Sequence, residues 1–414
     1  MNTKTAYLLL VALLVTACVN DDTNFDDLIN GAGGNDSIPE EVITPIDIDL
    51  DFSALDEVDD VPVTDETSEA YNDYEENTNW KYTINIAWDG ETATLSGNTT
   101  RVRATVEGGH VVIRSTSTRV HYVLSGASDN GSLKIYCETR FKVTLNGLNL
   151  TNPNGAAINN QGGKSLYLVL ADGTQNTLSD GTAYSDTEGE QMKGTFFSEG
   201  QVIVSGKGAL TINGQCRHGL VSDDYFRFRP GCKVNVNCST GSGIKANDGI
   251  TIDGGVINVA VSGDGAKGIR CDSTMTVNGG RTTIVTTGGV AVTTGTDVVA
   301  DTSSCAGIKC DYPLTINGGT VRIKSTGEGG KGINNAGDVI VNGGTLQVVT
   351  TGIKGTTSPK GIKGDGTLTV TGGTVYSYSA GGSPIDMASG ISVADGYTIW
   401  ETKPRRVIIS FESN

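Results

Sequence analysis

Residues 307–320 read GIKCDYPLTINGGT, and this phrase recurs along the second half of the chain. The other clear copies are GIKANDGITIDGGV from Gly243, GIRCDSTMTVNGGR from Gly268, GINNAGDVIVNGGT from Gly332 and GIKGDGTLTVTGGT from Gly361. In every copy the Gly-Gly pair begins eleven residues after the opening glycine. A phrase that returns at a nearly fixed period indicates a repeat architecture, in which each copy is one structural unit.

The phrase predicts short strands separated by glycine corners. A degenerate copy starts at Gly219, and successive copies start 24, 25, 39, 25 and 29 residues apart. Leu314 and Ile316 fall on one side and Thr315 on the other, which is the period-two alternation of a strand. The opening glycine and the Gly-Gly pair suit tight corners. We therefore predict an all-β parallel β-helix with one coil per repeat, from which residues 286–304 bulge as a loop.

The segments on either side of the repeats differ from them in composition. We expect residues 80–125 to form strands that cover the N-terminal end, residues 126–380 to form the coils, and residues 381–414 to cover the other end. Residues 18–79 contain twenty Asp or Glu and no Lys or Arg, which predicts a disordered acidic tether. The net charge of −17 comes from that tether. Residues 80–414 are nearly neutral, so no nucleic-acid partner is expected.

The chain begins MNTKTAYLLLVALLVTAC, which has the parts of an export signal. Lys4 precedes an apolar run that is too short to cross a membrane, as in a secretory signal peptide over residues 1–17. The letters VTAC resemble a bacterial lipobox, and the resemblance implies a lipid on Cys18. We then expect a bacterial cell-envelope protein, exposed at the outer-membrane surface and held by lipid alone. The alternative is an ordinary signal peptide with a chance cysteine.

Seven cysteines remain beyond Cys18. Their spacings contain no CxxC pair, and the chain has three histidines, so no zinc site is expected. Cys271 and Cys310 occupy the same position of the repeat, next to the buried isoleucine. We interpret them as small core residues that face inward.

The phrase also predicts ladders of side chains along the coils. Its second position is apolar and faces inward, so its third and fifth positions face solvent. The third position is mostly a cation and the fifth mostly a carboxylate, a mixture that can hydrogen-bond the hydroxyl groups of an extended sugar chain. The candidate carbohydrate-binding residues are Lys245, Arg270, Asp272, Lys309, Asp311, Lys363 and Asp365. The alternative is that these charges only pair with one another.

Closely spaced carboxylates could also recruit Ca²⁺, which takes several oxygen ligands in flexible geometry. The candidate metal ligands are Asp223, Asp224, Asp248 and Asp264. The alternative is that they serve as turn residues.

The stretches GLNLTNPNGAAI, LADGTQNTLSDG and LTING, together with the recurring phrase, resemble the bacterial carbohydrate-binding β-helix proteins related to a clostridial cellulose- and pectin-binding protein. The resemblance covers about residues 80–380. It implies a right-handed parallel β-helix, bound Ca²⁺ and polysaccharide binding without catalysis. The family phrase is Gly-Asp-Gly-Ile, whereas this chain keeps Gly-Asp-Gly only around Asp264 and has Lys267, Lys331 and Lys360 just before other copies.

Three functions remain open from the sequence. The leading hypothesis is a monomeric, non-catalytic surface lipoprotein that binds plant cell-wall or other acidic polysaccharides with the help of Ca²⁺. An alternative is a pectate-lyase-like polysaccharide lyase, with Lys245, Arg270 or Lys309 as the proton-abstracting base. A third is a structural adhesin that binds proteins. The fold alone does not separate them.

Overall fold

The computed structural model describes residues 43–55, 59–295, 298–402 and 405–411. The expected signal peptide and Cys18 lie outside these described residues. The chain divides into two units, Met1–Thr44 and Pro45–Asn414, and the second unit contains the solenoid. Within the described ranges, no helix combines the length and the apolar character needed to cross a bilayer.

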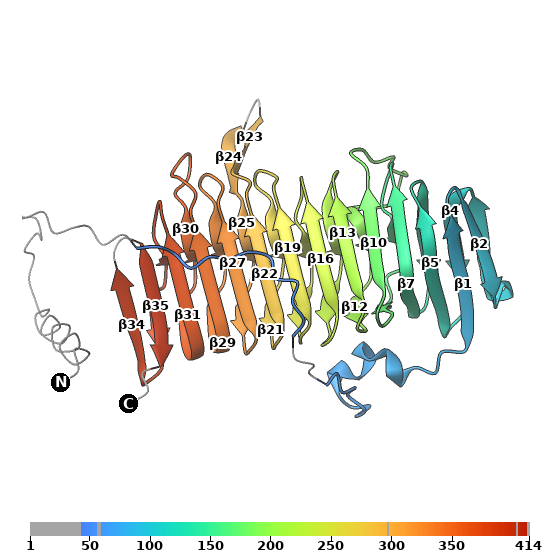
Figure 1. The fold of residues 1–414 in the computed structure, drawn as a ribbon, viewed down its shortest axis with the longest axis horizontal. Coiled ribbons are helices and arrows are strands. Elements are labelled where there is room, and N and C mark those ends of the chain that lie inside the picture. The colour runs from blue at the N-terminus through green and yellow to red at the C-terminus, as the bar shows by residue number, and fades with distance from the viewer. Residues whose placement is uncertain (1–42, 56–58, 296–297, 403–404, 412–414) are drawn as a thin grey trace, which may run out of the picture. The chain divides into compact units, whose positions relative to one another are not determined.

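The chain folds as a parallel β-solenoid of about 11 turns, which confirms the predicted all-β parallel β-helix (Figure 1). Each turn contributes strands to three faces. The first face is a sheet of its own and carries the strands β4 (Gly109–Ser115), β6 (Gly131–Cys137), β8 (Ile158–Asn160), β11 (Gly194–Ser198), β14 (His218–Ser222), β17 (Ile244–Ala246), β20 (Lys267–Cys271), β25 (Ala306–Cys310), β28 (Lys331–Asn335), β30 (Lys360–Gly364) and β32 (Ile385–Met387).

The other two faces share one continuous sheet, because some strands turn a corner without a break. The second face carries β1 (Tyr82–Asp89), β5 (Val120–Ser128), the start of β7 (Phe141–Asn152), β9 (Leu166–Leu170), β12 (Val202–Ser205), β15 (Tyr225–Phe228), β18 (Gly249–Ile252), β21 (Met275–Val277), β26 (Leu314–Ile316), the starts of β29 (Val339–Thr350) and β31 (Leu368–Ser379), and β33 (Ile391–Val393). The third face carries β10 (Gln175–Asp180), β13 (Ala209–Gly214), β16 (Lys233–Cys238), β19 (Val256–Val261), β22 (Arg281–Thr286), β27 (Thr320–Ser325) and the ends of β7, β29 and β31.

Equivalent residues of successive coils stack in register, as the phrase predicts. Ile244 pairs with Ile269, which pairs with Ile308, and the stack continues through Ile333 to Ile362. All five are fully buried, so the second position of the phrase builds the core. The inward placement of the two repeat-position cysteines is also confirmed, since both are fully buried and lie opposite each other on neighbouring strands.

The glycines of the phrase have two different roles. Gly319, the second member of its Gly-Gly pair, has a φ of +73°, as a corner requires. The opening glycine does not turn the chain, contrary to our expectation. Gly307 lies within β25, where an added Cβ would stand 2.3 Å from Ile323 Cγ2. Its role is to let the first face approach the core side chains of the third.

Extra strands cover both ends. At the N-terminal end, β2 (Thr92–Gly97) pairs antiparallel with β1, and β3 (Arg103–Glu107) pairs antiparallel with β4. At the C-terminal end, the hairpin of β34 (Tyr397–Thr402) and β35 (Arg406–Phe411) pairs antiparallel with β31. The excess residues of the longest repeat leave the solenoid as predicted, but they form the hairpin β23 (Val290–Gly295)–β24 (Val298–Ser304) instead of a loop.

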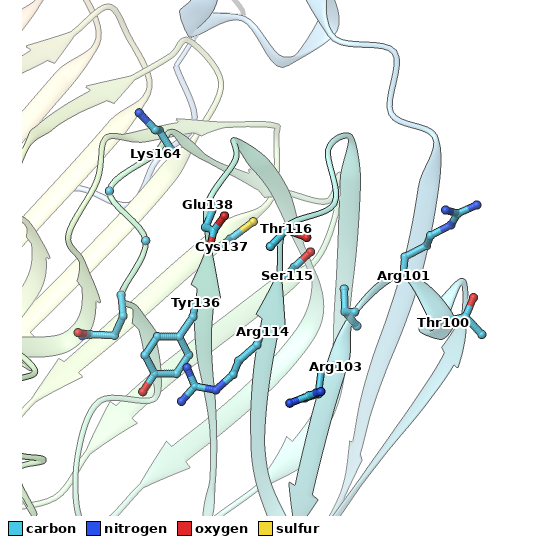
Figure 2. A pocket seen from close by; sticks show the side chains of 14 residues that line it. Thr100, Arg101, Arg103, Arg114, Ser115, Thr116, Tyr136, Cys137, Glu138 and Lys164 are labelled. Atoms are coloured by element: carbon cyan, nitrogen blue, oxygen red, sulfur yellow. The ribbon is translucent and has the colours of Figure 1, made fainter.

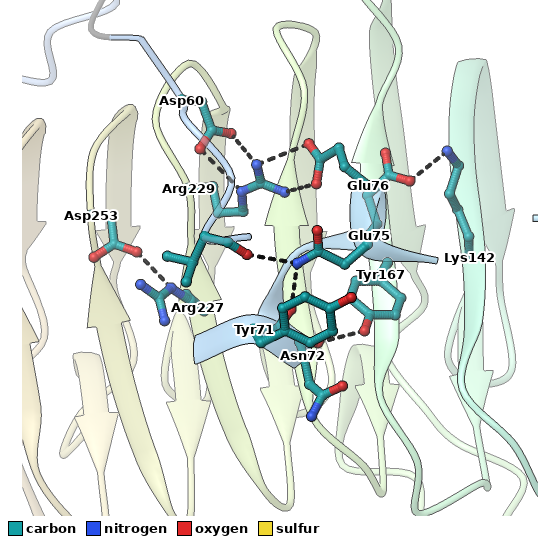
Figure 3. A network of polar contacts seen from close by, with 12 residues as sticks. Asp60, Tyr71, Asn72, Glu75, Glu76, Lys142, Tyr167, Arg227, Arg229 and Asp253 are labelled. Atoms are coloured by element: carbon teal, nitrogen blue, oxygen red, sulfur yellow. Dashed lines mark hydrogen bonds and ion pairs between the residues drawn. The ribbon is translucent and has the colours of Figure 1, made fainter. Parts of the chain in front are cut away.

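The second half of the predicted tether is ordered, so that prediction is wrong for residues 45–55 and 59–79. Residues 59–79 include two short 3₁₀ helices, η1 (Glu69–Asp73) and η2 (Glu75–Asn77), while a third, η3 (Thr99–Arg101), lies at the N-terminal end of the solenoid. The segment lies over the second face, where its carboxylates meet cations of the coils (Figure 3).

The deepest of these contacts is made by Arg229, whose side chain is 1% exposed. Its Nη1 and Nη2 donate to the two carboxylate oxygens of Glu76 at 2.8 and 2.9 Å, and its Nη2 lies 2.9 Å from Asp60 Oδ2. Arg227 bridges Asp73 and Asp253 in the same way. Composition predicted disorder because it does not show that the folded coils present cations to the acidic segment.

Candidate functional site

The predicted ladder forms on the first face. Lys245 pairs in register with Arg270, which pairs with Lys309, so three cations from β17, β20 and β25 stand side by side. Lys363 continues the row two coils further on, in β30. The structure thus brings the predicted third-position residues together on one outward face.

Most of these charges neutralise one another. Arg270 Nε donates to Asp272 Oδ1 at 2.7 Å, and Lys245 Nζ lies 3.5 Å from the other oxygen of the same carboxylate. Lys309 likewise donates to Asp311 of its own coil. Burial acts to raise the pKa of Asp272, but Arg270 and Lys245 outweigh it and the pKa is lowered. The alternative of internal pairing therefore describes β17, β20 and β25.

The C-terminal end of the ladder is different. Neither Lys363 nor Asp365 forms an ion pair with another described residue, and Asp365 is exposed. These two remain available to a ligand at the C-terminal coils.

The four predicted metal ligands do not gather into one cluster. Asp223 is engaged by Lys193 and Asn247, and Asp264 Oδ1 accepts the backbone N–H of Gly289 at 2.7 Å. Asp224 and Asp248 lie close enough for their charges to interact, and burial followed by Asp248 raises the pKa of Asp224. Two carboxylates fall short of the six to eight oxygens that Ca²⁺ takes. No group of three or more potential metal-ligating side chains occurs within the described ranges.

The lysines that replace the family's aspartate hold loops in place. Lys267 Nζ donates to the carbonyl oxygens of Gly265 and Ser304 at 2.5 and 2.6 Å. Lys331 makes the equivalent pair of bonds to Gly329 and Ser358. Both side chains are buried, and burial lowers the pKa of each to about 8. Their ammonium groups are thus committed to backbone carbonyls.

A basic groove lies at the N-terminal coils, where the sequence predicted no site (Figure 2). It has a volume of about 770 Å³ and spans β3, β4, β6 and the loop after β8. Arg101, Arg103, Arg114 and Lys164 line it, while Glu138 is the one carboxylate among its lining residues in the described part of the chain. Neither Arg103 nor Lys164 has an ion-pair partner among the described residues.

An aromatic ring forms part of the groove. Arg114 lies over the ring of Tyr136 with 3.7 Å between its Cζ and the ring centroid. The Tyr136 hydroxyl donates to Glu190, which also pairs with Lys134 at 2.8 Å, so the ring is held in place. Tyr136 can present apolar surface to a sugar ring while Arg114 presents charge.

A second hollow of about 600 Å³ adjoins the groove. The two share Glu138, Gly163 and Lys164, and the second adds Arg119 and Arg140. We call the combined surface the basic groove; the described residues that line it include six cations and one carboxylate, while Glu190 lies beside it, bonded to Tyr136 and Lys134. Such a surface favours anionic ligands. The sequence feature that could have revealed the groove is the high density of arginine between residues 101 and 119. This stretch lies outside the repeated phrase.

Comparisons with known proteins place the chain in a family. A model of the carbohydrate-binding domain-containing protein family matches residues 107–268 and 265–355, which is more than half of the chain. The chain belongs to this family. A family member from Acetivibrio thermocellus is 25% identical over 114 residues, which are 27% of this chain and 40% of that protein. The chain thus matches less than half the length of that curated relative.

A solved structure, described as the polysaccharide lyase-like protein from C. thermocellum, gadolinium derivative, is similar in fold. It is 18% identical with a TM-score of 0.42, and the match covers 76% of this chain and 98% of the other. The family membership confirms the resemblance seen in the sequence.

Proposed function

We propose that this carbohydrate-binding family member is a non-catalytic binding protein for acidic polysaccharides, and that the basic groove is its primary binding surface. The observation that carries the proposal is the excess of cations over carboxylates among the residues that line the groove, beside the half-buried ring of Tyr136. Arginine and lysine side chains bind carboxylate and sulfate oxygens through charge-assisted hydrogen bonds. A linear glycan carrying such groups could place several of them along the groove at once.

The described residues that line the groove include one carboxylate, Glu138, which is a poor ligand set for Ca²⁺, so we propose binding that does not need Ca²⁺. Retention of the protein on immobilised polygalacturonate, dextran sulfate and neutral hydroxyethylcellulose, each with and without a chelator, tests the proposal. We expect retention on the two acidic glycans in both conditions and little on the neutral one. Loss of all retention in the presence of chelator would contradict the claim that binding needs no Ca²⁺. Equal retention on the neutral glycan would contradict the preference for acidic glycans.

A lyase receives less support from the geometry. The three candidate bases, Lys245, Arg270 and Lys309, are paired with Asp272 and Asp311. The buried lysines with a lowered pKa donate to loop carbonyls and face away from solvent. A base must reach the proton it removes. Appearance of unsaturated product from polygalacturonate would favour the lyase.

We further propose that the protein is lipid-anchored at Cys18, at the outer surface of the bacterial envelope. The support is the export signal and the letters VTAC at its end. Metabolic labelling with a fatty acid should mark the wild type and not a Cys18→Ser variant. Labelling of both proteins, or of neither, would contradict the anchor.

A further inference from the structure

An acidic segment of the chain lies extended across the third face of the solenoid, and we call residues 45–55 the strap (Figure 1). Its letters PIDIDLDFSAL alternate apolar and acidic residues. The Ile46 backbone N–H donates to Tyr376 Oη at 3.3 Å, near one end, and Asp51 exchanges two hydrogen bonds with Asn258, near the other. The strap thus spans the coils from β31 to β19.

The surface beneath the strap has the composition of a binding site. We call it the strap floor; it consists of outward side chains of three neighbouring strands, β19, β22 and β27, and its residues are Asn258, Arg281, Thr283, Arg322 and Lys324. Asn258 and Thr283 are 1% and 0% exposed although they point away from the core, because the strap covers them. The floor therefore offers three cations and two neutral polar groups to an extended chain.

The strap satisfies this floor only in part. Arg281 Nη2 is engaged, because it donates to the backbone carbonyl oxygens of Asp51 and Ser53 and lies 3.2 Å from Asp51 Oδ1. Arg322 Nη2 donates to the backbone carbonyl oxygen of Asp47 at 3.2 Å, and Arg322 forms no ion pair with a carboxylate of the described ranges. The Nε atoms of Arg281 and Arg322 and the hydroxyl of Thr283 are buried without a hydrogen-bond partner among the described residues. A buried polar group without a partner is costly. A ligand that supplied more oxygens would therefore compete well with the strap.

The ion pairs between the strap and Lys324 are exposed to solvent. Lys324 Nζ contacts Asp47 at 2.9 Å and Asp49 at 3.5 Å, but both carboxylates are 78% exposed. Exposed ion pairs contribute little. Ile48 between them is fully buried and is the main apolar contact of the strap, whereas Phe52 is 64% exposed. The segment that follows is held separately, because Arg229 pairs with Asp60 and Glu76.

We propose that the strap floor is a second binding surface for extended acidic polysaccharide, and that the strap is its built-in occupant, displaced when the glycan binds. The ligand class rests on the proposed function, while the site and its regulation do not depend on the basic groove. Carboxylate or sulfate oxygens on a linear glycan would reach Arg322 and Arg281, and sugar hydroxyls would pair with Thr283 and Asn258. The strap mimics such a chain, since it carries an acid at every second residue.

Ile48→Asn tests the proposal, because it opens the strap without changing any charge. It is placed in full-length protein carrying Arg103→Gln and Lys164→Gln, which weaken the basic groove. Phe52→Asn in the same background is the matched control, since Phe52 is exposed. Titration with polygalacturonate and with dextran sulfate distinguishes carboxylate from sulfate as the preferred group. We expect Ile48→Asn to bind about tenfold more tightly than the control, as for a site that is closed about nine-tenths of the time.

Two further measurements make the result specific. Adding Arg322→Gln to the open variant should abolish the gain, because that guanidinium contacts the glycan in the open state. Hydrogen exchange of the Ile46 and Asp51 amides should accelerate when polygalacturonate is added to the wild type. Equal affinity of the Ile48→Asn and Phe52→Asn proteins would overturn the strap proposal, even where the wild type binds through its groove. Absence of binding by every protein would overturn both proposals.

If Ile48→Asn prevents folding, seen as loss of the β-sheet circular dichroism, neutralising the strap replaces it. Asp47→Asn, Asp49→Asn and Asp51→Asn together loosen the strap, and Asp89→Asn, Asp129→Asn and Asp395→Asn form a charge-matched control on exposed positions elsewhere. The strap variant should bind acidic glycan more tightly than its control. Equal affinities would again overturn the proposal.

Discussion

Replacing Arg229 with methionine should detach the acidic segment from the second face and destabilise the protein. The guanidinium is 1% exposed and contacts two carboxylates through four N–O pairs between 2.8 and 3.2 Å. Removing one partner of a buried ion pair costs roughly 3–5 kcal/mol, because the other charge stays buried and unpaired. Here Asp60 and Glu76 keep 24% and 44% of their side-chain exposure, so water can partly solvate them. We therefore expect about 3 kcal/mol.

Urea unfolding, followed by circular dichroism, measures this cost. A matched triple variant, Arg229→Met with Asp60→Asn and Glu76→Gln, should recover most of the lost free energy of unfolding, since no charge is then left unpaired. Arg229→Lys should fall between wild type and methionine because it keeps the charge and loses the two-pronged geometry. A methionine variant as stable as the wild type would refute the reasoning that this contact holds the segment. A triple variant no better than the single one would refute its electrostatic cause.

Two other predictions concern the coils. Gly307→Ala should lower the free energy of unfolding by about 1–3 kcal/mol, since the new Cβ would stand 2.3 Å from Ile323 Cγ2. Gly163→Ala is the control and should cost far less, because the space around Gly163 is open. Equal urea midpoints for the two variants would contradict the packing argument. His218 accepts the Ser242 N–H through Nδ1 at 2.7 Å, and burial lowers its pKa to about 4. Below pH 6.5, His218 therefore binds a proton in the unfolded chain but stays neutral in the folded protein. Stability should fall by on the order of 2–3 kcal/mol between about pH 6.5 and 4, and His218→Gln should reduce this slope.

The coil could be predicted from sequence because its determinants are local. The alternation of Leu314 with Thr315, the isoleucine stack and the corner glycine Gly319 each act within one repeat, and stacking only multiplies them. The role of Gly307 could not be predicted in the same way. Its reason is Ile323, which approaches from another face.

The functional surfaces depend on contacts between distant parts of the chain. The ladder positions were predicted correctly, but spacing does not reveal that Asp272 would be shared by cations of two coils. The basic groove joins Arg103 to Lys164, 61 residues later, across strands that pair only in the folded chain. The prediction of disorder was wrong for the strap because Asp47 pairs with Lys324, which lies 277 residues away in the sequence. The composition of the acidic segment does not show which distant cation it will contact.

Titration of the wild type with polygalacturonate at low ionic strength, beside two double variants, tests the central claim most directly. Arg103→Gln with Lys164→Gln removes two groove cations, and Lys233→Gln with Lys354→Gln removes two exposed cations elsewhere. We predict about tenfold or greater weakening for the groove variant and nearly unchanged affinity for the control, with the difference shrinking as salt is added. Equal weakening in both variants, or none in the groove variant, would contradict the assignment of glycan binding to the basic groove.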